Sequence, residues 1–413
     1  MVVCGRIAAD DRCFGDGVKA QLAIRGGDPV RETMLPYARH SVDEKDIGAV
    51  VEVLRSDWLT TGPTVDRFEE AFAAWVGARH AVVLSSGTAA LHAATFAAAV
   101  GPGDEAITTA LTFAASANCI LYQGARPVFA DVEPDTLNIE HAQVEAKITA
   151  NTKAIIPVDY TGQPADLDEI KEIARRHKLV VIEDAAHALG AIYKQRRIGT
   201  LADMTVFSAH PVKHITTGEG GIVTTNNPEL ARRVRMFRNH GITTEARERH
   251  GKGRWFYEMV ALGYNYRLTD IQCALGLAQL EKLEGWLERR ASIANRYNEE
   301  FTGMPEVELP VVRPDRTSAW HLYVIRLNLD KLRVGRAEMF DALYAENIGV
   351  NVHYIPVPWH PYYRKLGYER GGWPVAEDAY NRLISLPMFA AMSNRDIADV
   401  IEAVRKVISA YRL

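Results

Sequence analysis

The segment FSAHPVKHITTGEGG, residues 207–221, places Lys213 between a Ser-x-His sequence and a glycine-rich end with several hydroxyl side chains. Such a lysine can be a reactive amine held over a cofactor, or an ordinary solvated side chain, because most lysines are exposed. A reactive amine must be partly neutral, and burial beside cationic groups lowers a lysine pKa in that direction. The lysine alone does not decide between these two interpretations, so the decision depends on the rest of the chain.

Two other segments carry groups that would complete a cofactor site. SSGTAAL, residues 85–91, begins a predicted helix, so Gly87 and Thr88 offer backbone N–H groups and a hydroxyl to a phosphate. Asp184 ends the apolar run of VVIEDAAHALG, where a carboxylate is costly unless a cation meets it. Each feature also has a plainer explanation, since Ser-Gly-Thr is ordinary helix capping and a surface aspartate at a strand end is common.

Taken together, these groups are the parts needed to hold pyridoxal 5'-phosphate (PLP). The helix N-terminus would bind the phosphate, Asp184 would keep the pyridine nitrogen protonated, and the Lys213 amine would form the Schiff base. Ser208, five residues before Lys213, is placed to add a hydroxyl to the phosphate. Phe113, which follows ALT, is placed to stack on one face of the ring. A phenylalanine is by default a core residue, so stacking is expected only in combination with the other groups.

Length and composition limit the class of protein. A chain of 413 residues exceeds the usual single core, which predicts two domains. A net charge of -4 leaves no basic surface for nucleic acid, and no apolar run approaches the roughly 18 residues of a membrane helix. Four scattered cysteines, without metal-ligand spacing, predict free thiols in a reducing cytoplasm and no metal site. We therefore expect a cytoplasmic globular protein that binds neither nucleic acid nor membrane.

Short apolar strands alternate with helical patterns over residues 81–210, which predicts a mostly parallel sheet with helices on both faces. The predicted strands are AVVLSS, EAITTAL, PVFADV, AIIPVDY, LVVIEDA and MTVFSAH. The predicted helices are TAALHAATFAAAVG, AASANCILYQG and DLDEIKEIARRH. Ligands of such sheets bind at the carboxyl ends of the strands.

The character of the chain changes after a long helical stretch, residues 264–301, which can bridge two lobes. The strand signals AWHLYVIRL and GVNVHYIPV and the closing helix RDIADVIEAVRKVISAY predict a smaller α+β domain. The N-terminus has acidic residues where a signal peptide would be apolar, so it is predicted to be a loosely held extension, disordered at its tip. The predicted division is 1–30 extension, 31–285 large PLP-binding domain and 286–413 small C-terminal domain.

Five segments together resemble the DegT/DnrJ family of nucleotide-sugar aminotransferases, namely WLTTGPTVDRFE, SSGTAAL, EDAAHALGA, FSAHPVKHITTGEGGIV and GYNYRLTDIQCALGLAQL. The resemblance runs from about residue 33 to the C-terminus. Within the family, HPVKHITTGEGG and VHYIPVPWHPYYRKLGY most resemble the branch of pseudaminic acid biosynthesis, which acts on a UDP-linked 4-keto-6-deoxy amino sugar. The resemblance implies the α/β fold type I of PLP-dependent aminotransferases, with a mostly parallel seven-stranded sheet in the large domain and a smaller α+β C-terminal domain.

The resemblance also implies a cofactor role for each matching residue. Lys213 matches the lysine that is bonded to PLP, Asp184 the partner of the pyridine nitrogen, and His187 the contact to the ring hydroxyl. The remaining matches are the phosphate contacts and the stacking aromatic, namely Gly87, Thr88, Ser208 and Phe113.

Three further matches concern the partner subunit and the substrate. Asn265 in GYNYR matches an asparagine that the family sends across the interface to the other subunit's phosphate, which implies a homodimer. His353 and Tyr354 match the segment that approaches the sugar. A satisfied histidine and a core tyrosine on one strand explain this last pair nearly as well.

The implied reaction is the PLP-dependent transfer of an amino group from glutamate to the keto carbon, C4, of a nucleotide-linked 4-keto-6-deoxy sugar. The nucleotide would be UDP, and the product an amino sugar for surface glycans. Lys213 would act as general base and acid, with ping-pong kinetics. The family also contains dehydratases that lack the lysine, so its presence favours transamination. Two alternatives stay open: an enzyme for a non-nucleotide cyclic ketone of the cyclitol or aminoshikimate type, and a PLP-binding regulatory protein without turnover.

Overall fold

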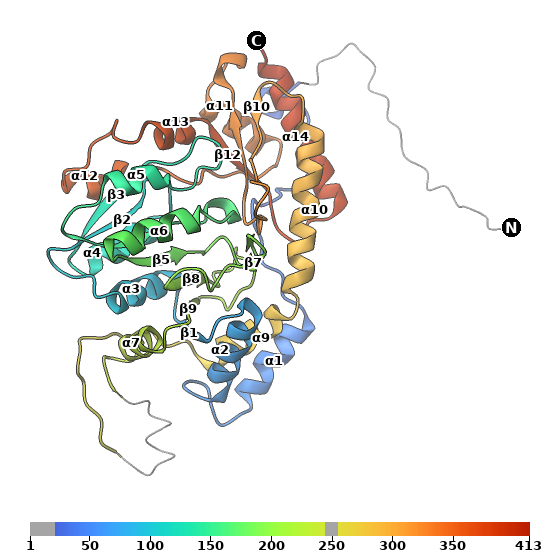
Figure 1. Cartoon of the computed structure of the whole chain (residues 1–413). Coiled ribbons are helices and arrows are strands. Elements are labelled where there is room, and N and C mark those ends of the chain that lie inside the picture. The colour runs from blue at the N-terminus through green and yellow to red at the C-terminus, as the bar shows by residue number, and fades with distance from the viewer. Residues whose placement is uncertain (1–20, 244–254) are drawn as a thin grey trace.

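A computed structural model of the chain describes residues 21–243 and 255–413, so the predicted disordered tip lies outside the described residues. Its centre is a seven-stranded sheet in the order β1-β9-β8-β5-β4-β2-β3 (Figure 1). The strands are β1 His80–Leu84, β2 Glu105–Thr109, β3 Arg126–Ala130, β4 Thr152–Ile156, β5 Val180–Asp184, β8 Met204–Ser208 and β9 Gly221–Thr225. A separate two-stranded hairpin pairs β6 Ile192–Tyr193 with β7 Arg196–Arg197.

The predicted α/β class with a mostly parallel sheet is confirmed. Strands β3, β2, β4, β5 and β8 are parallel neighbours, whereas β9 runs antiparallel to both β8 and β1. The strand β9 was not predicted, because its short sequence, GIVTT, follows directly on the glycine-rich segment after Lys213. Parallel strands bring their carboxyl ends to one edge of the sheet, which is where the predicted site residues follow them.

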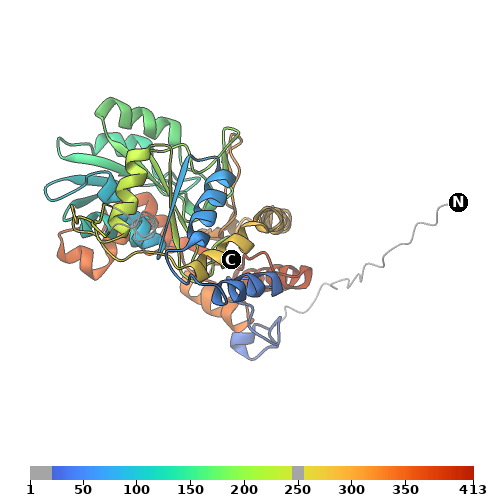
Figure 2. The same cartoon turned by 90° about the horizontal axis from the view of Figure 1, so that it is seen from below.

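Helices cover both faces of this sheet, as the view from below shows (Figure 2). Alternate strand residues point to opposite faces, so Val83 packs with α2, α6 and α9 while Val82 packs with α3, α4 and α7. The helices up to α7 are α1 Glu44–Leu54, α2 Pro63–Val76, α3 Gly87–Ala97, α4 Ala115–Tyr122, α5 His141–Ala146, α6 Leu167–His177 and α7 Pro228–Arg238. The next two are α9 Asp270–Leu280 and α10 Leu283–Phe301.

The predicted long helical stretch is thus two helices, α9 and α10, separated by Glu281 and Lys282. Thr269 caps α9 through a capping box with Gln272. Helix α10 runs along the side of the molecule toward the chain's C-terminal part (Figure 1), and its second half packs in a separate hydrophobic core through Ile293 and Tyr297. The stretch therefore contributes to two hydrophobic cores, one through Cys273 and Leu280 and the other through Ile293 and Tyr297.

The second unit contains a three-stranded antiparallel sheet, β10 Val307–Glu308, β11 Tyr323–Leu327 and β12 Leu383–Leu386. Its helices are α11 Arg336–Ala345, α12 Pro361–Lys365, α13 Pro374–Arg382 and α14 Asn394–Tyr411. The prediction of a strand at GVNVHYIPV, residues 349–357, is wrong, since there only Asn351 forms an isolated bridge, to Ser385. The segment leaves the small sheet because it crosses to the large unit, where the N–H of Val357 donates to the carbonyl of Ala110 at 2.9 Å.

Residues 21–30, part of the predicted extension, are held by a buried carboxylate. Glu346 accepts hydrogen bonds from the N–H groups of Ala23 and Val30, each at 3.0 Å, and pairs with Lys406 at 2.8 Å. Leu22 is buried in the core of the smaller unit. This described part of the extension therefore packs against the smaller unit. None of the helices that the structure describes is long and apolar enough to cross a membrane.

Candidate active site

The segments that follow the central strands meet at a cavity of about 730 Å³. The smaller unit closes part of it with residues 351–354, and the segment before β11 contributes His321. All predicted site residues except Asn265 line this cavity, namely Gly87, Thr88, Phe113, Asp184, His187, Ser208, Lys213, His353 and Tyr354. The fold thus brings together side chains that are spread over more than half of the chain.

One wall of the cavity is the N-terminus of helix α3. Ser86 caps the helix, since its hydroxyl accepts a hydrogen bond from the N–H of Ala89 at 3.1 Å. The turn lies against the end of β8, because a Cβ added at Gly87 would be 3.1 Å from the Cβ of Ser208 and 3.2 Å from its hydroxyl. The first N–H groups of a helix lack intrahelical partners. This wall therefore combines free backbone donors with the Ser208 hydroxyl, which is the chemistry of an anion site.

Asp184, the last residue of β5, is buried and held in place by two donors. Its carboxylate accepts hydrogen bonds from the hydroxyl of Ser116 at 2.7 Å and from the N–H of Ala186 at 3.2 Å. Burial raises the pKa of Asp184, and the Ser116 hydrogen bond opposes this rise. A cationic N–H group arriving in the cavity would stabilise the charged carboxylate. Sequence analysis missed Ser116, whose signal was a hydroxyl near the start of an apolar helix.

Lys213 follows Ser208 by five positions, and its side chain is partly buried. Burial lowers the pKa of Lys213 to about 8, although the Asp184 carboxylate opposes this shift and the Arg290 guanidinium adds to it. The amine lies 3.2 Å from Nε2 of His321. A lysine with this pKa is partly neutral near neutral pH, and the neutral amine is the form that attacks a carbonyl.

A group of aromatic side chains forms the wall opposite helix α3. Nε2 of His187 lies 3.1 Å from the hydroxyl of Tyr354, and burial holds the pKa of His187 well below its usual value. Nδ1 of His353 is hydrogen-bonded to the hydroxyl of Ser385 at 2.8 Å. The backbone carbonyl of His353 accepts a hydrogen bond from Tyr160. His353 is thus a satisfied histidine that also lines the cavity.

Phe113 and Asn265 differ in their relation to the cavity. Phe113 is 58% exposed and its ring lies 5.9 Å from that of Tyr354, so it is a cavity residue and not a core residue. Asn265 is exposed, forms an isolated bridge with Asn239 and does not line the cavity of its own chain.

These residues fit PLP in charge and hydrogen-bonding character. The helix N-terminus with Ser208 suits a phosphate, the buried carboxylate of Asp184 suits a protonated ring nitrogen, and the Lys213 amine suits an aldehyde. Nδ1 of His187 is buried and has no hydrogen-bond partner in the described part of the chain, so it is open to a polar group of a ligand.

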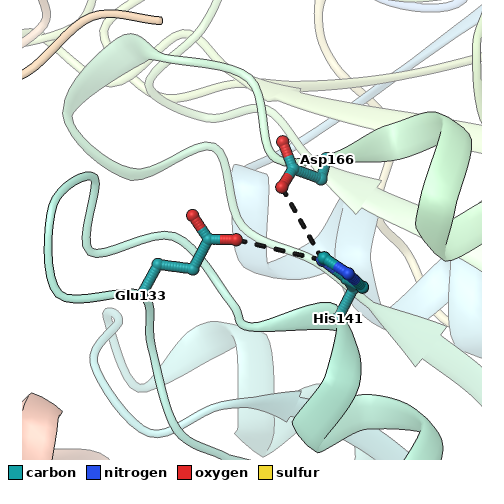
Figure 3. Close-up of side chains that lie close together, drawn as sticks. All are labelled: Glu133, His141 and Asp166. Carbon is teal, nitrogen blue, oxygen red and sulfur yellow. Dashed lines mark ion pairs between the residues drawn. The ribbon is translucent and has the colours of Figure 1, made fainter.

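A second polar cluster, drawn in Figure 3, contributes no residue to the lining of this cavity. Glu133, His141 and Asp166 bring ligand-type atoms within 4.8 Å of one another. Arginines already neutralise the carboxylates, since Arg313 pairs with both of them and Arg316 lies 2.8 Å from Asp166. The cluster is therefore an ion-pair network that joins the loop after β3 to the segment before β11, and we assign no metal to it.

Comparisons with known proteins agree with this geometry. Residues 40–405 match the model of the DegT/DnrJ/EryC1/StrS aminotransferase family. The spore coat polysaccharide biosynthesis protein SpsC of Bacillus subtilis is 46% identical over 381 residues, which cover 92% of this chain and 98% of SpsC.

Two solved structures show how closely the fold is shared. A putative sugar aminotransferase of Streptococcus pneumoniae, solved in its pyridoxamine phosphate form, has a TM-score of 0.86 and 33% identity, covering 91% of this chain and 99% of that one. PseC of Helicobacter pylori, an aminotransferase of pseudoaminic acid biosynthesis, has a TM-score of 0.85 and 32% identity, covering 92% of this chain and 100% of PseC. The Streptococcus protein is also solved in its PLP form. The chain therefore belongs to the DegT/DnrJ/EryC1/StrS aminotransferase family and is a PLP-dependent aminotransferase of fold type I.

Proposed function

We propose that this aminotransferase transfers the amino group of glutamate to C4 of a UDP-linked 4-keto-6-deoxy sugar, as a step in making an amino sugar for surface glycans. The observation that carries the proposal is the placement of the partly buried Lys213 amine and the buried Asp184 carboxylate on one cavity beside a helix N-terminus. We place the reaction in the cytoplasm, because the described cysteines, Cys119 and Cys273, are free thiols.

The predicted site residues that line the cavity have separate roles in this proposal. Bound PLP supplies an electron sink. Asp184 would stabilise the protonated ring nitrogen, and the Lys213 amine would accept the proton from Cα of glutamate and donate it again. We assign phosphate binding to Gly87, Thr88 and Ser208. Contacts to the cofactor ring are assigned to Phe113 and His187, and contacts to the sugar to His353 and Tyr354.

The sugar acceptor is supported by the relatives. The names of SpsC, PseC and the Streptococcus protein refer to polysaccharide biosynthesis, pseudoaminic acid biosynthesis and sugar transamination. The UDP group and the C4 position rest on the resemblance of HPVKHITTGEGG and VHYIPVPWHPYYRKLGY to the pseudaminic acid branch.

A substrate screen tests the proposed acceptor. The purified enzyme is incubated with glutamate and either a UDP-, GDP- or dTDP-linked 4-keto-6-deoxy sugar or a free cyclic ketone, and 2-oxoglutarate and the aminated product are measured. We expect turnover with the UDP-linked sugars and an amine at C4. Turnover with free cyclic ketones alone would instead favour the cyclitol-type alternative. If the absorbance spectrum of the PLP-loaded protein does not change when glutamate is added, the alternative of a regulatory protein without turnover would be favoured.

We further propose a homodimer in which Asn265 of one chain contacts the phosphate bound by the other. Asn265 is exposed and absent from its own cavity, which leaves it available to a second copy. The adjoining segment carries large exposed apolar side chains, including Trp255 at 84% and Leu262 at 76%. Several large exposed apolar side chains in one segment are consistent with an interface.

Mixing two impaired variants, at a PLP concentration too low to load Asn265→Ala, tests the shared site. A hydrogen bond to the charged phosphate stabilises binding by roughly 1.5–3 kcal/mol, so Asn265→Ala is expected to weaken PLP retention by about 10- to 100-fold. In a heterodimer of Asn265→Ala and Lys213→Ala chains, one site then has intact Lys213 and, from the other chain, intact Asn265. We expect activity to appear on mixing. A verified heterodimer without activity would show that Asn265 does not act across the interface.

A further inference from the structure

The Lys213 amine has a polar partner that comes from a distant part of the chain. Nε2 of His321, a residue just before β11, lies 3.2 Å from Nζ of Lys213, and the His321 side chain is only 3% exposed. In the charged state a lysine has three N–H donors and no acceptor. The Lys213 ammonium therefore donates to Nε2, and His321 is the neutral acceptor.

The backbone on both sides of the His321 Cα is fixed by a buried arginine. Nη1 of Arg290, in α10, donates to the carbonyl of Trp320 at 3.0 Å and to that of His321 at 3.2 Å. The same nitrogen donates to the carbonyl of Met388 at 3.2 Å. Arg290 is only 3% exposed. Its charge is thus directed at the carbonyls of the turn that carries His321.

Other contacts hold the His321 ring and its turn. The N–H of Ala319 donates to the carbonyl of Gly162 at 2.8 Å, and Nε2 of His214 donates to the carbonyl of Ala319 at 2.9 Å. The ring centroids of His187 and His321 are 4.4 Å apart. The imidazole therefore has a defined position between Lys213 and His187.

Packing alone does not explain a histidine here. Nδ1 of His321 is buried and lacks a hydrogen-bond partner in the part of the chain that the structure describes. Burying a polar group without a partner is unfavourable, whereas an apolar ring of the same size would carry no such cost. The other ring nitrogen, Nε2, contacts the Lys213 amine, which indicates that the imidazole serves the lysine.

We propose that His321 is a positioning residue that holds the Lys213 amine while this amine is not bonded to the cofactor, and that Arg290 fixes His321. The inference rests on the proposed role of Lys213 in proton transfer. During that step the free amine must stay within reach of the proton on Cα, and a displacement of about 1 Å can lower the rate about 100-fold. The hydrogen bond to His321 restricts the position of this amine.

The first test compares His321→Phe, which keeps an aromatic ring, with His321→Gln, which restores a hydrogen-bond acceptor. We expect the single-turnover rate with glutamate to fall about 10- to 100-fold in His321→Phe and to recover most of that loss in His321→Gln. The KM for glutamate should change less than about threefold. Glutamate deuterated at Cα should show a larger isotope effect in His321→Phe, because proton transfer becomes more limiting.

A second measurement uses the cofactor-free protein and does not depend on turnover. Competitive acetylation of Lys213 across a pH series, read by mass spectrometry, reports the pKa of its amine. In the wild type we expect a pKa of about 8. In His321→Phe the ammonium loses its acceptor, so the pKa should fall by about one unit. A purely structural change would leave this pKa in place.

Thermal melting verifies that each variant is folded. A folded His321→Phe protein with a wild-type rate, isotope effect and Lys213 pKa would overturn the proposal. If His321→Phe does not fold, Arg290→Lys is tested in the same measurements. This variant keeps the positive charge, but the lysine amine is poorly placed to reach the carbonyls of Trp320 and His321. A wild-type rate, isotope effect and Lys213 pKa in Arg290→Lys would overturn the proposal. A failure of the proposed role of Lys213 is distinguishable from a failure of this inference. If Lys213 is not the reactive amine, borohydride reduction of the PLP-loaded protein would leave Lys213 unlabelled in the wild type as well as in the His321 variants.

Discussion

Lys213→Ala is expected to lower transamination by at least about 1,000-fold, because the group that moves the Cα proton is lost. The variant should still bind PLP non-covalently, since Gly87, Thr88 and Asp184, which line the cavity and are proposed to contact the phosphate and the ring, remain. Turnover is measured as 2-oxoglutarate formed from glutamate in the presence of the keto-sugar acceptor. PLP content is measured on the same samples.

The control for this variant is Lys194→Ala. Lys194 is a lysine outside the cavity, and its exposed ammonium pairs with Asp168 at 2.7 Å. Surface ion pairs contribute about 0–1 kcal/mol, so Lys194→Ala should keep wild-type turnover. A Lys213→Ala protein that retained most of its activity would remove Lys213 from the mechanism.

Asp184→Asn is expected to cause the second largest loss, about 100-fold or more in turnover. Breaking a buried charge pair costs about 3–5 kcal/mol, and here the lost partner would be the anion that keeps the ring nitrogen protonated. The asparagine can still accept a hydrogen bond from Ser116, so the cavity wall should persist and PLP content should fall only modestly. The measurement is kcat with saturating glutamate, together with the PLP content of the purified variant.

Asp203→Asn is the matched control for this second variant. Asp203 lies just before β8, and its carboxylate accepts a hydrogen bond from the N–H of Val181 at the start of β5, at 2.8 Å. It tests the effect of removing an exposed carboxylate that is hydrogen-bonded within the same pair of strands, but outside the active-site cavity. Normal turnover in Asp184→Asn, or an equal loss in both variants, would mean that Asp184 acts only as a strand-end residue.

The sequence predicts the local parts of this site well because each one depends on a short strand-turn-helix unit. The segment from β1 into α3 carries Gly87, and the end of β5 carries Asp184, so their places follow once the strands are assigned. A parallel sheet then brings these ends to one edge. The α/β class and the PLP cofactor were predictable on this basis, whereas the aminotransferase family was predictable from the resemblance of longer motifs.

Contacts between distant segments were not predictable in the same way. His321 lies 108 positions after Lys213, and its place depends on the turn that Arg290 holds from another helix. The incorrect strand prediction at residues 349–357 has a similar origin. An alternating apolar pattern fits a strand locally, but the segment crosses to the large unit, where the N–H of Val357 donates to the carbonyl of Ala110. The role of Ser116 was also not predictable, because its hydroxyl reaches the Asp184 carboxylate only when α4 packs beside the end of β5.

The most direct test of the central claim is reductive labelling of the wild-type enzyme. Borohydride added to the PLP-loaded protein should fix the cofactor covalently to Lys213, and trypsin does not cleave after a modified lysine. Mass spectrometry should then find the label on a single peptide spanning residues 198–232, at Lys213. Label on a different lysine, or a PLP-loaded protein that borohydride leaves unlabelled, would contradict the assignment of Lys213 as the reactive amine.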